Sequence, residues 1–412
     1  MKSSIDKFEI ELTGLLKRYF NDDELTRLNQ NISLPKNGSD KLAGMINDFY
    51  RNQLEIDISN YSERIRIDRT VTFSEKKLPE DKFYRFLLDL SQLCLSRGRL
   101  NLANELFKKV NRTSSNKILK AESLLGLADV FSRRADWQRS LVTIEEAESI
   151  YVELNDNSGL AKCENVLGSI YGERGELTKS RDYFLNALSL LNPATDLELA
   201  ANLEMNLGIL ENIRENTDEA INHLNKALAS YKKLDHKLRI TETKHNIGMV
   251  YLDLGDYKSA IASFDEAIEI AKENSFLSIL CIIYLAKSQA LVEMDDLYYA
   301  SEFADQALYI SNSTDDKLTA ADSYRVKGII ERQRKNYSAA ETYLLTSIRI
   351  NTKLKNDQNI AITSLELAEL YEEKNNSQSK KSYLTSALSY FKKIKAYKEV
   401  KKIEHMLGIG TA

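Results

Sequence analysis

The chain has 412 residues, of which only 3 are proline and 15 are glycine. Because these two residues disfavour helix interiors most strongly, their scarcity favours helix along nearly the whole chain. The 57 basic residues almost balance the 61 acidic ones, for a formal net charge of −4. A chain with this balance has no overall attraction for nucleic acid or for an anionic membrane surface, so we expect neither as a partner.

The sequence contains no obvious signal for secretion or membrane insertion. Acidic residues stand at Asp6, Glu9 and Glu11, where a secretory signal needs an apolar core. The most apolar stretch, Phe276 to Ala286, is too short to span a bilayer.

The cysteines agree with a cytoplasmic location. They stand far apart in the sequence and are odd in number, which disfavours a disulfide framework. We expect reduced thiols on buried helix faces, at Cys94, Cys163 and Cys281.

Residues 1–80 show no internal repeat and are predicted to form a small N-terminal helical module. Pro79 marks its junction with the next region. Isoleucines between Ile56 and Phe73 favour an extended or short β segment there. We expect amphipathic helices over residues 4–20, 22–31 and 39–53.

From residue 81 to 391 the sequence repeats with a period of 40 residues. The clearest copy has small residues at Gly248, Gly255 and Ala267, and aromatic residues at Tyr251 and Phe264. Steps of 40 residues in either direction find related positions, and the outermost copy, near Phe83, follows a shorter step of 37 residues. About eight copies are recognisable.

This pattern predicts a helical hairpin. Small residues at Gly248 and Ala267 allow two antiparallel helices to approach closely. Gly255 suits the turn between the helices, because glycine tolerates the left-handed backbone that ends a helix. One such hairpin cannot bury its apolar face alone, so successive copies are expected to stack into a solenoid.

The order of small and aromatic residues resembles the tetratricopeptide repeat, from Phe83 to Phe391. That repeat has about 34 residues, whereas the period here is longer and the usual proline after the second helix is missing. The sequence is therefore most similar to the long-helix subclass of kinesin light chains, adaptors with Leu-Gly-Asn repeats, and bacterial peptide-responsive regulators. The resemblance implies an all-α, right-handed solenoid whose first helices line a concave interaction surface.

The N-terminal segment shows a second resemblance. Residues 15–28 and 41–46 are similar to the death-like effector-associated domains of bacterial defence proteins, which implies homotypic helical contacts. Self-association through this module is one expectation, and capping of the solenoid is the other.

Residues 392–412 are predicted to form a C-terminal capping helix and tail. Val400, Ile403 and Leu407 recur at helical spacing and are expected to cover the last hairpin, while the lysines face water.

The sequence shows no catalytic or metal-binding motif. There is no H-E-x-x-H, C-x-x-C pair or G-x-S-x-G, and the four histidines stand too far apart to form one cluster. We therefore expect a protein that is not an enzyme and that needs no cofactor or metal ion.

The informative positions are those that the first helix of each hairpin presents to the concave face. In the middle copies these positions are apolar, with amides beside them. Amides at Asn206 and Asn246 recur one period apart, and asparagine can hold a peptide backbone by paired hydrogen bonds. The predicted peptide-binding residues are Asn165, Asn202, Met205, Asn206, Ile209, His245, Asn246, Met249, Leu252, Gln289 and Arg325. Packing against neighbouring hairpins is the alternative explanation for each apolar member.

The function predicted from these features is that of a scaffold or adaptor that binds a protein or peptide in the groove. One alternative is a regulatory sensor whose superhelix changes shape when it binds a signalling peptide. Another is an accessory subunit of an enzyme or defence complex, recruited through the N-terminal module.

Overall fold

The computed structural model describes residues 7–32, 58–134, 136–192, 195–314, 316–394 and 396–409. Within these ranges every regular element is an α-helix, as the all-α prediction required. The helix expected over residues 39–53 lies outside the described residues. None of the described helices combines the length and apolarity needed to cross a bilayer.

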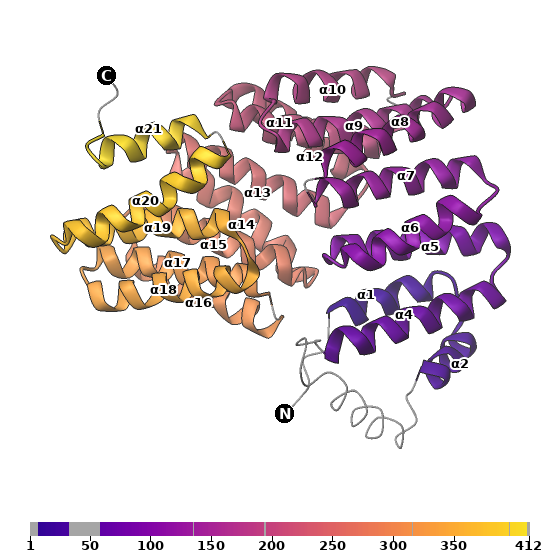
Figure 1. The fold of residues 1–412 in the computed structure, drawn as a ribbon, viewed down its shortest axis with the longest axis horizontal. Coiled ribbons are helices and arrows are strands. Elements are labelled where there is room, and N and C mark those ends of the chain that lie inside the picture. Colours follow the sequence, from indigo (N-terminus) through magenta and orange to yellow (C-terminus); the bar gives the residue numbers. More distant parts are fainter. Residues whose placement is uncertain are drawn as a thin grey trace. The chain divides into compact units, whose positions relative to one another are not determined.

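The described residues between Glu80 and Lys393 form eight helical hairpins (Figure 1). Their first helices start at intervals of 40 residues after an initial step of 37, which confirms the predicted period and the solenoid fold. The first helices are α5 (Glu80–Ser96), α7 (Lys117–Ser132), α9 (Asn157–Glu173), α11 (Leu197–Ile213), α13 (Lys237–Leu254), α15 (Leu277–Glu293), α17 (Lys317–Gln333) and α19 (Asp357–Glu373). The second helices are α6 (Leu100–Thr113), α8 (Trp137–Leu154), α10 (Leu177–Leu190), α12 (Thr217–Lys233), α14 (Tyr257–Glu273), α16 (Leu297–Ser313), α18 (Tyr337–Leu354) and α20 (Ser377–Lys393).

The turn between the two helices of a hairpin uses a left-handed residue. Gly255 has φ 82°, in the conformation predicted for it. The equivalent positions Glu215, Asp295 and Lys335 have φ between 60° and 63° without being glycine. A left-handed residue other than glycine is strained, so these turns are held by the packing of the two helices and not by glycine alone.

Close approach inside a hairpin depends on the small residue of the first helix. A Cβ atom added at Gly248 would lie 2.4 Å from Cε1 of Phe264, and one at Gly168 would lie 2.5 Å from Cε1 of Phe184. The aromatic ring of the second helix therefore occupies the space that glycine leaves open, and each pair buries its ring almost completely.

The chain divides into two compact units, residues 1–199 and residues 200–412. In the first unit the N-terminal helices α1 (Lys7–Lys17), α2 (Asp22–Ile32) and α4 (Ile58–Lys77) precede the hairpins. They share one apolar core with the first hairpins, in which Phe8, Phe20 and Ile67 pack with Phe86 and Phe107. The domain boundary proposed at residue 80 stays a prediction.

The extended or β segment expected between Ile56 and Phe73 is wrong for its described part, because Ile58–Lys77 is helical. Ile67, Thr70, Val71 and Ser74 are all buried. Their spacing of three, four and seven residues is that of one helix face. The expectation of a β segment gave more weight to the β-branched residues than to this spacing.

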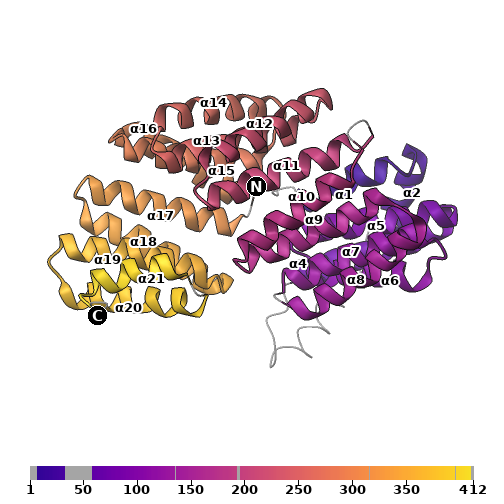
Figure 2. The ribbon, with the colours of Figure 1, turned by 90° about the horizontal axis from the view of Figure 1, so that it is seen from above.

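In the second unit successive hairpins stack side by side, as α17–α18 and α19–α20 do in Figure 2. The short helix α21 (Tyr397–Met406) packs on α20. Its Ile403 is fully buried, and Val400 and Leu407 pack against the same cluster. Lys392 and Lys393, which were expected in the capping helix, belong to α20.

Cys94, Cys163 and Cys281 are buried and none of the three forms a disulfide, as predicted. Burial raises the pKa of the Cys163 thiol to about 12, so this group is protonated at neutral pH. Among the described residues no group of three His, Cys, Asp or Glu side chains is arranged to hold a metal ion.

Candidate functional site

A pocket of about 410 Å³ lies on the face formed by the first helices of the second unit. Four successive hairpins contribute to it through α13, α15, α17 and α19, and Tyr257 adds the start of α14. Both apolar and charged side chains line it. The lining residues are Leu252, Asp253, Tyr257, Gln289, Val292, Glu293, Arg325, Val326, Ile329 and Glu366.

Three of the predicted binding residues meet in this pocket. Leu252 comes from the last turn of α13, Gln289 from α15 and Arg325 from the middle of α17. They are far apart in the sequence, but all three lie on the first helices of consecutive repeats. Stacking of these helices brings them together. The other predicted residues do not line this pocket.

The apolar stripe is divided between packing and exposure. Met205 is buried, and its sulfur lies 3.7 Å from Oγ1 of Thr243. Met249 is partly buried and packs against the core of the following hairpins. Ile209 is 38% exposed. Met205 therefore packs between hairpins in this structure, and its role in ligand binding stays a prediction.

Three of the predicted asparagines, Asn165, Asn202 and Asn206, are already engaged within the protein. The carbonyl oxygen of Asn202 accepts a hydrogen bond of 2.7 Å from the hydroxyl of Tyr231. Asn165 and Asn206 are half-buried and each has an interaction partner in the chain. Asn202 thus positions a buried tyrosine, and a ligand would have to compete for that oxygen.

His245 and Asn246 form a local pair. The Nδ1 atom of His245 lies 3.3 Å from Oδ1 of Asn246, and the imidazole ring lies against Phe264. Burial lowers the pKa of His245, and the hydrogen bond with Asn246 only partly opposes this effect. A neutral ring that donates from Nδ1 fits this geometry.

Beside the pocket, α17 and α19 are joined by an ion-pair network centred on Arg332. Its guanidinium lies 3.4 Å from Glu366, 2.7 Å from Glu369 and 2.8 Å from Glu373. Burial raises the pKa of Glu366, as does the neighbouring Glu369, whereas Arg332 and Arg325 lower it. Most of the charge of Arg332 is thus satisfied inside the protein.

Glu366 was missed by sequence reasoning, although a signal for it existed. It stands at the same repeat position as Asn206 and Asn246, four and three periods further along. Following that position to the end of the array would have found it. At Glu366 a carboxylate replaces the amide of this repeat position, so a pattern of amides alone does not include it.

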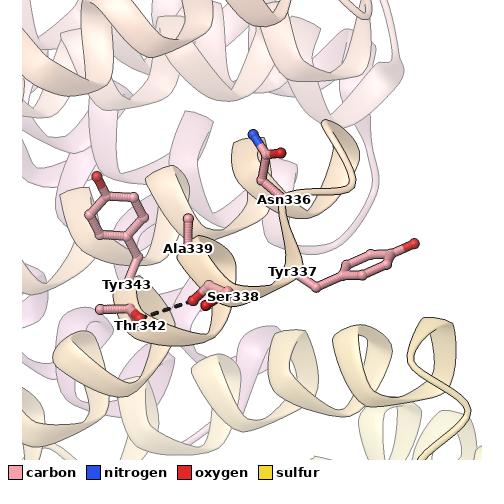
Figure 3. A pocket seen from close by; sticks show the side chains of 6 residues that line it. All are labelled: Asn336, Tyr337, Ser338, Ala339, Thr342 and Tyr343. Carbon is pink, nitrogen blue, oxygen red and sulfur yellow. Dashed lines mark hydrogen bonds between the residues drawn. The ribbon is translucent and has the colours of Figure 1, made fainter.

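A second depression, of about 590 Å³, lies at the start of α18 (Figure 3). All of its lining residues belong to the segment Asn336–Tyr343, and Thr342 donates a hydrogen bond to the carbonyl of Ser338 within the same turn. In Figure 3 the rings of Tyr337 and Tyr343 extend to opposite sides of the helix start. Because side chains of one helix alone form it, we do not regard it as a binding site.

Repeated helical hairpins are the arrangement found in tetratricopeptide-type solenoids, and a family model agrees with this over part of the chain. Residues 199–273 match the family model described as tetratricopeptide repeat. Residues 297–408 match a family of uncharacterized proteins conserved in bacteria, and residues 99–173 match anaphase-promoting complex subunit 5.

The chain is similar to bacterial regulators of this fold. It is 26% identical to the transcriptional activator NprA of Geobacillus stearothermophilus over 194 residues, which are 46% of this chain and 47% of that protein. The chain thus matches about half the length of this curated relative.

Two solved structures share the fold. The Rap conjugation gene regulator of plasmid pLS20, in complex with the Phr* peptide, matches with a TM-score of 0.55 and 16% identity, over 82% of this chain and 92% of that one. Aspartyl phosphate phosphatase F from Bacillus subtilis matches with a TM-score of 0.55 and 14% identity, over 95% and 94%. At these identities the likeness establishes the fold alone.

Proposed function

We propose that this protein is a non-enzymatic adaptor or regulator that binds a peptide, or a short segment of a partner protein, in the pocket of the second unit. The observation that carries the proposal is the convergence of Leu252, Gln289 and Arg325 from three consecutive hairpins on one pocket. Apolar walls with a few convergent polar groups are typical of a ligand site. The peptide complex of a protein with the same fold supports a peptide as ligand.

The composition of the pocket supports binding without catalysis. No serine, cysteine or histidine is among the residues that line it. Serine and cysteine are common nucleophiles of covalent catalysis and histidine is the commonest base, so the pocket lacks the most frequent catalytic pair. The phosphatase named among the structural neighbours shares the fold, and a shared fold does not carry an activity.

A sensor is the second candidate, because one ligand would contact four hairpins at once. Neighbouring repeats in a solenoid interact mainly with each other. A ligand that bridges α13, α15, α17 and α19 would therefore couple elements that are otherwise only indirectly connected. We expect a measurable change in the compactness of the chain on binding, by small-angle scattering. Unchanged compactness would favour a passive adaptor.

The proposal can be tested with a synthetic library of random hexapeptides with free termini, incubated with the full chain. Bound peptides are identified by mass spectrometry and their affinities measured by calorimetry. We expect Gln289→Ala and Leu252→Ala to weaken binding by about 1–2 kcal/mol each, through a lost hydrogen bond and lost apolar contact.

Leu345→Ala is the matched control, since Leu345 is an exposed leucine of α18 outside the pocket. Its affinity should equal that of the wild type. A library without any binder, or binders indifferent to both pocket substitutions, would contradict the proposed function.

A further inference from the structure

Arg325 differs from the residues at the same position of the other hairpins. Those positions hold apolar side chains that pack into the core in four of the other copies, namely Leu88, Leu125, Met205 and Leu285. The side chain of Arg325 is only 17% exposed, so a cation stands where packing elsewhere places a leucine or methionine. Burying a charge costs free energy unless it is paired and hydrogen-bonded.

In the described part of the chain, the guanidinium of Arg325 has no hydrogen-bond acceptor. Its closest carboxylate contact is with Asp322, whose Oδ1 lies 4.0 Å from Nε. That same oxygen already accepts a hydrogen bond of 3.0 Å from Nδ2 of Asn359. A guanidinium has five N–H donors, and those of Arg325 face the pocket without a protein acceptor.

The other charges around the pocket are committed elsewhere or lie at its far end. Glu366 pairs with Arg332, and Asp253 accepts a hydrogen bond of 2.7 Å from Asn212. Glu293 is the last residue of α15, whereas Arg325 is the ninth residue of α17. When the two helices are aligned by the repeat, Glu293 stands eight residues further along than Arg325. This corresponds to roughly 12 Å of rise along the helix axis. Glu366 is close enough to Arg325 for the two charges to interact, but its carboxylate accepts its hydrogen bond from Arg332 and not from Arg325.

We propose that Arg325 pairs with a carboxylate of the bound peptide, supplied by its C-terminus or by an aspartate or glutamate side chain. This inference rests on the proposed function. A carboxylate matches the planar fork of a guanidinium and can accept two parallel hydrogen bonds. Leu252, Val292 and Ile329 would then pack against the residue that carries the carboxylate.

The experiment uses the hexapeptide that binds the full chain most tightly in the library selection. It is synthesised as the free acid, as the C-terminal amide, and with each acidic residue replaced by its amide. One of these changes should weaken binding to the wild type by roughly tenfold or more, the loss expected for a charged hydrogen bond. The amide that weakens binding identifies which carboxylate Arg325 holds.

Arg325→Gln should weaken binding of the free-acid peptide to the same extent. It should leave unchanged the affinity of the amide peptide whose substitution weakens binding to the wild type. Arg349→Gln is the matched control, because Arg349 is an exposed arginine of α18 outside the pocket and its loss changes the net charge equally. This variant should bind like the wild type. Thermal melting of both variants verifies that they fold.

The inference is overturned if no acid-to-amide change weakens binding, or if Arg325→Gln weakens acid and amide equally, as a role in packing alone would. In both cases the peptide still binds, so the proposed function survives. If the library yields no binder, the proposed function fails and this inference fails with it.

Discussion

Equivalent positions on the first helices of the two units carry side chains that differ in charge and in how the charges are paired. In the first unit the charges are paired across repeats, since Arg85 of α5 forms an ion pair with Glu122 of α7, and Lys162 of α9 lies 3.8 Å from the same carboxyl. Leu125 stays buried there. In the second unit the equivalent of Leu125 is Arg325, which lacks a hydrogen-bonded partner among the described residues. At this position of the repeat Leu125 packs in the first unit, as Met205 and Leu285 do in the second, whereas Arg325 serves, in our proposal, recognition.

The comparison predicts that the interiors of the hairpins are equivalent even though their surfaces are not. Phe184 and Phe264 are buried against Gly168 and Gly248 in the two units. Phe184→Ala and Phe264→Ala should each lower the free energy of unfolding by about 3–5 kcal/mol, through lost burial and a cavity. Urea denaturation of the full chain measures both. If the two losses of unfolding free energy differed by more than about half, the interiors of the hairpins would not be equivalent.

Exchanging the residues at the shared position sharpens the comparison. Leu125→Arg should lower the free energy of unfolding by roughly 2–4 kcal/mol, because it buries a cation without a built partner. Arg325→Leu should raise it by about 1 kcal/mol, since leucine packs at this position in Leu285. Thermal denaturation checks both signs. Destabilisation by Arg325→Leu would mean that Arg325 is structural.

The ion pairs of the two units are expected to differ in strength. Arg332 is 15% exposed and serves three glutamates, whereas Arg85 is 45% exposed. Arg332→Ala should cost about 1–3 kcal/mol of stability, because it leaves carboxylates uncompensated in a partly buried site. Arg85→Ala should cost less than about 1 kcal/mol, as solvent screens exposed pairs. Equal losses in chemical denaturation would contradict the distinction.

The smallest expected effect is a pH dependence at Glu366. Burial and Glu369 raise its pKa above the ordinary glutamate value, against the opposing influence of Arg325 and Arg332. The folded state then binds more protons than the unfolded state between the two pKa values. This contribution to stability is therefore fully present below the unfolded pKa and is lost as the pH rises through the folded pKa.

Glu366→Gln should remove that dependence, so its melting temperature relative to the wild type should increase from pH 4 to pH 8. Glu372→Gln, which removes an exposed charge from the same helix, is the control for net charge. A parallel pair of pH profiles for Glu366→Gln and the wild type would show that Glu366 does not titrate differently in the folded state.

The wrong and missing predictions share a physical cause. The segment Ile58–Phe73 has β-branched residues that favour strands, but burial of one helix face decided its structure. For Asn202 the sequence did not indicate that its oxygen accepts a hydrogen bond from Tyr231, and its role in ligand binding stays a prediction. A local pattern specifies which side chain is polar, but not which neighbour reaches it. The roles of Asn206 and Asn246 in ligand binding stay predictions.

By itself the sequence determined the repeat, its 40-residue period and the positions of the hairpin turns, because small and aromatic residues must recur wherever two helices touch. It also placed Leu252, Gln289 and Arg325 on the first helices. Only the tertiary structure decided that these three share a pocket and that Arg332, not Arg325, receives the nearby glutamates. Such pairings depend on which side chains of stacked helices come within reach of one another, and this leaves no periodic trace in the sequence.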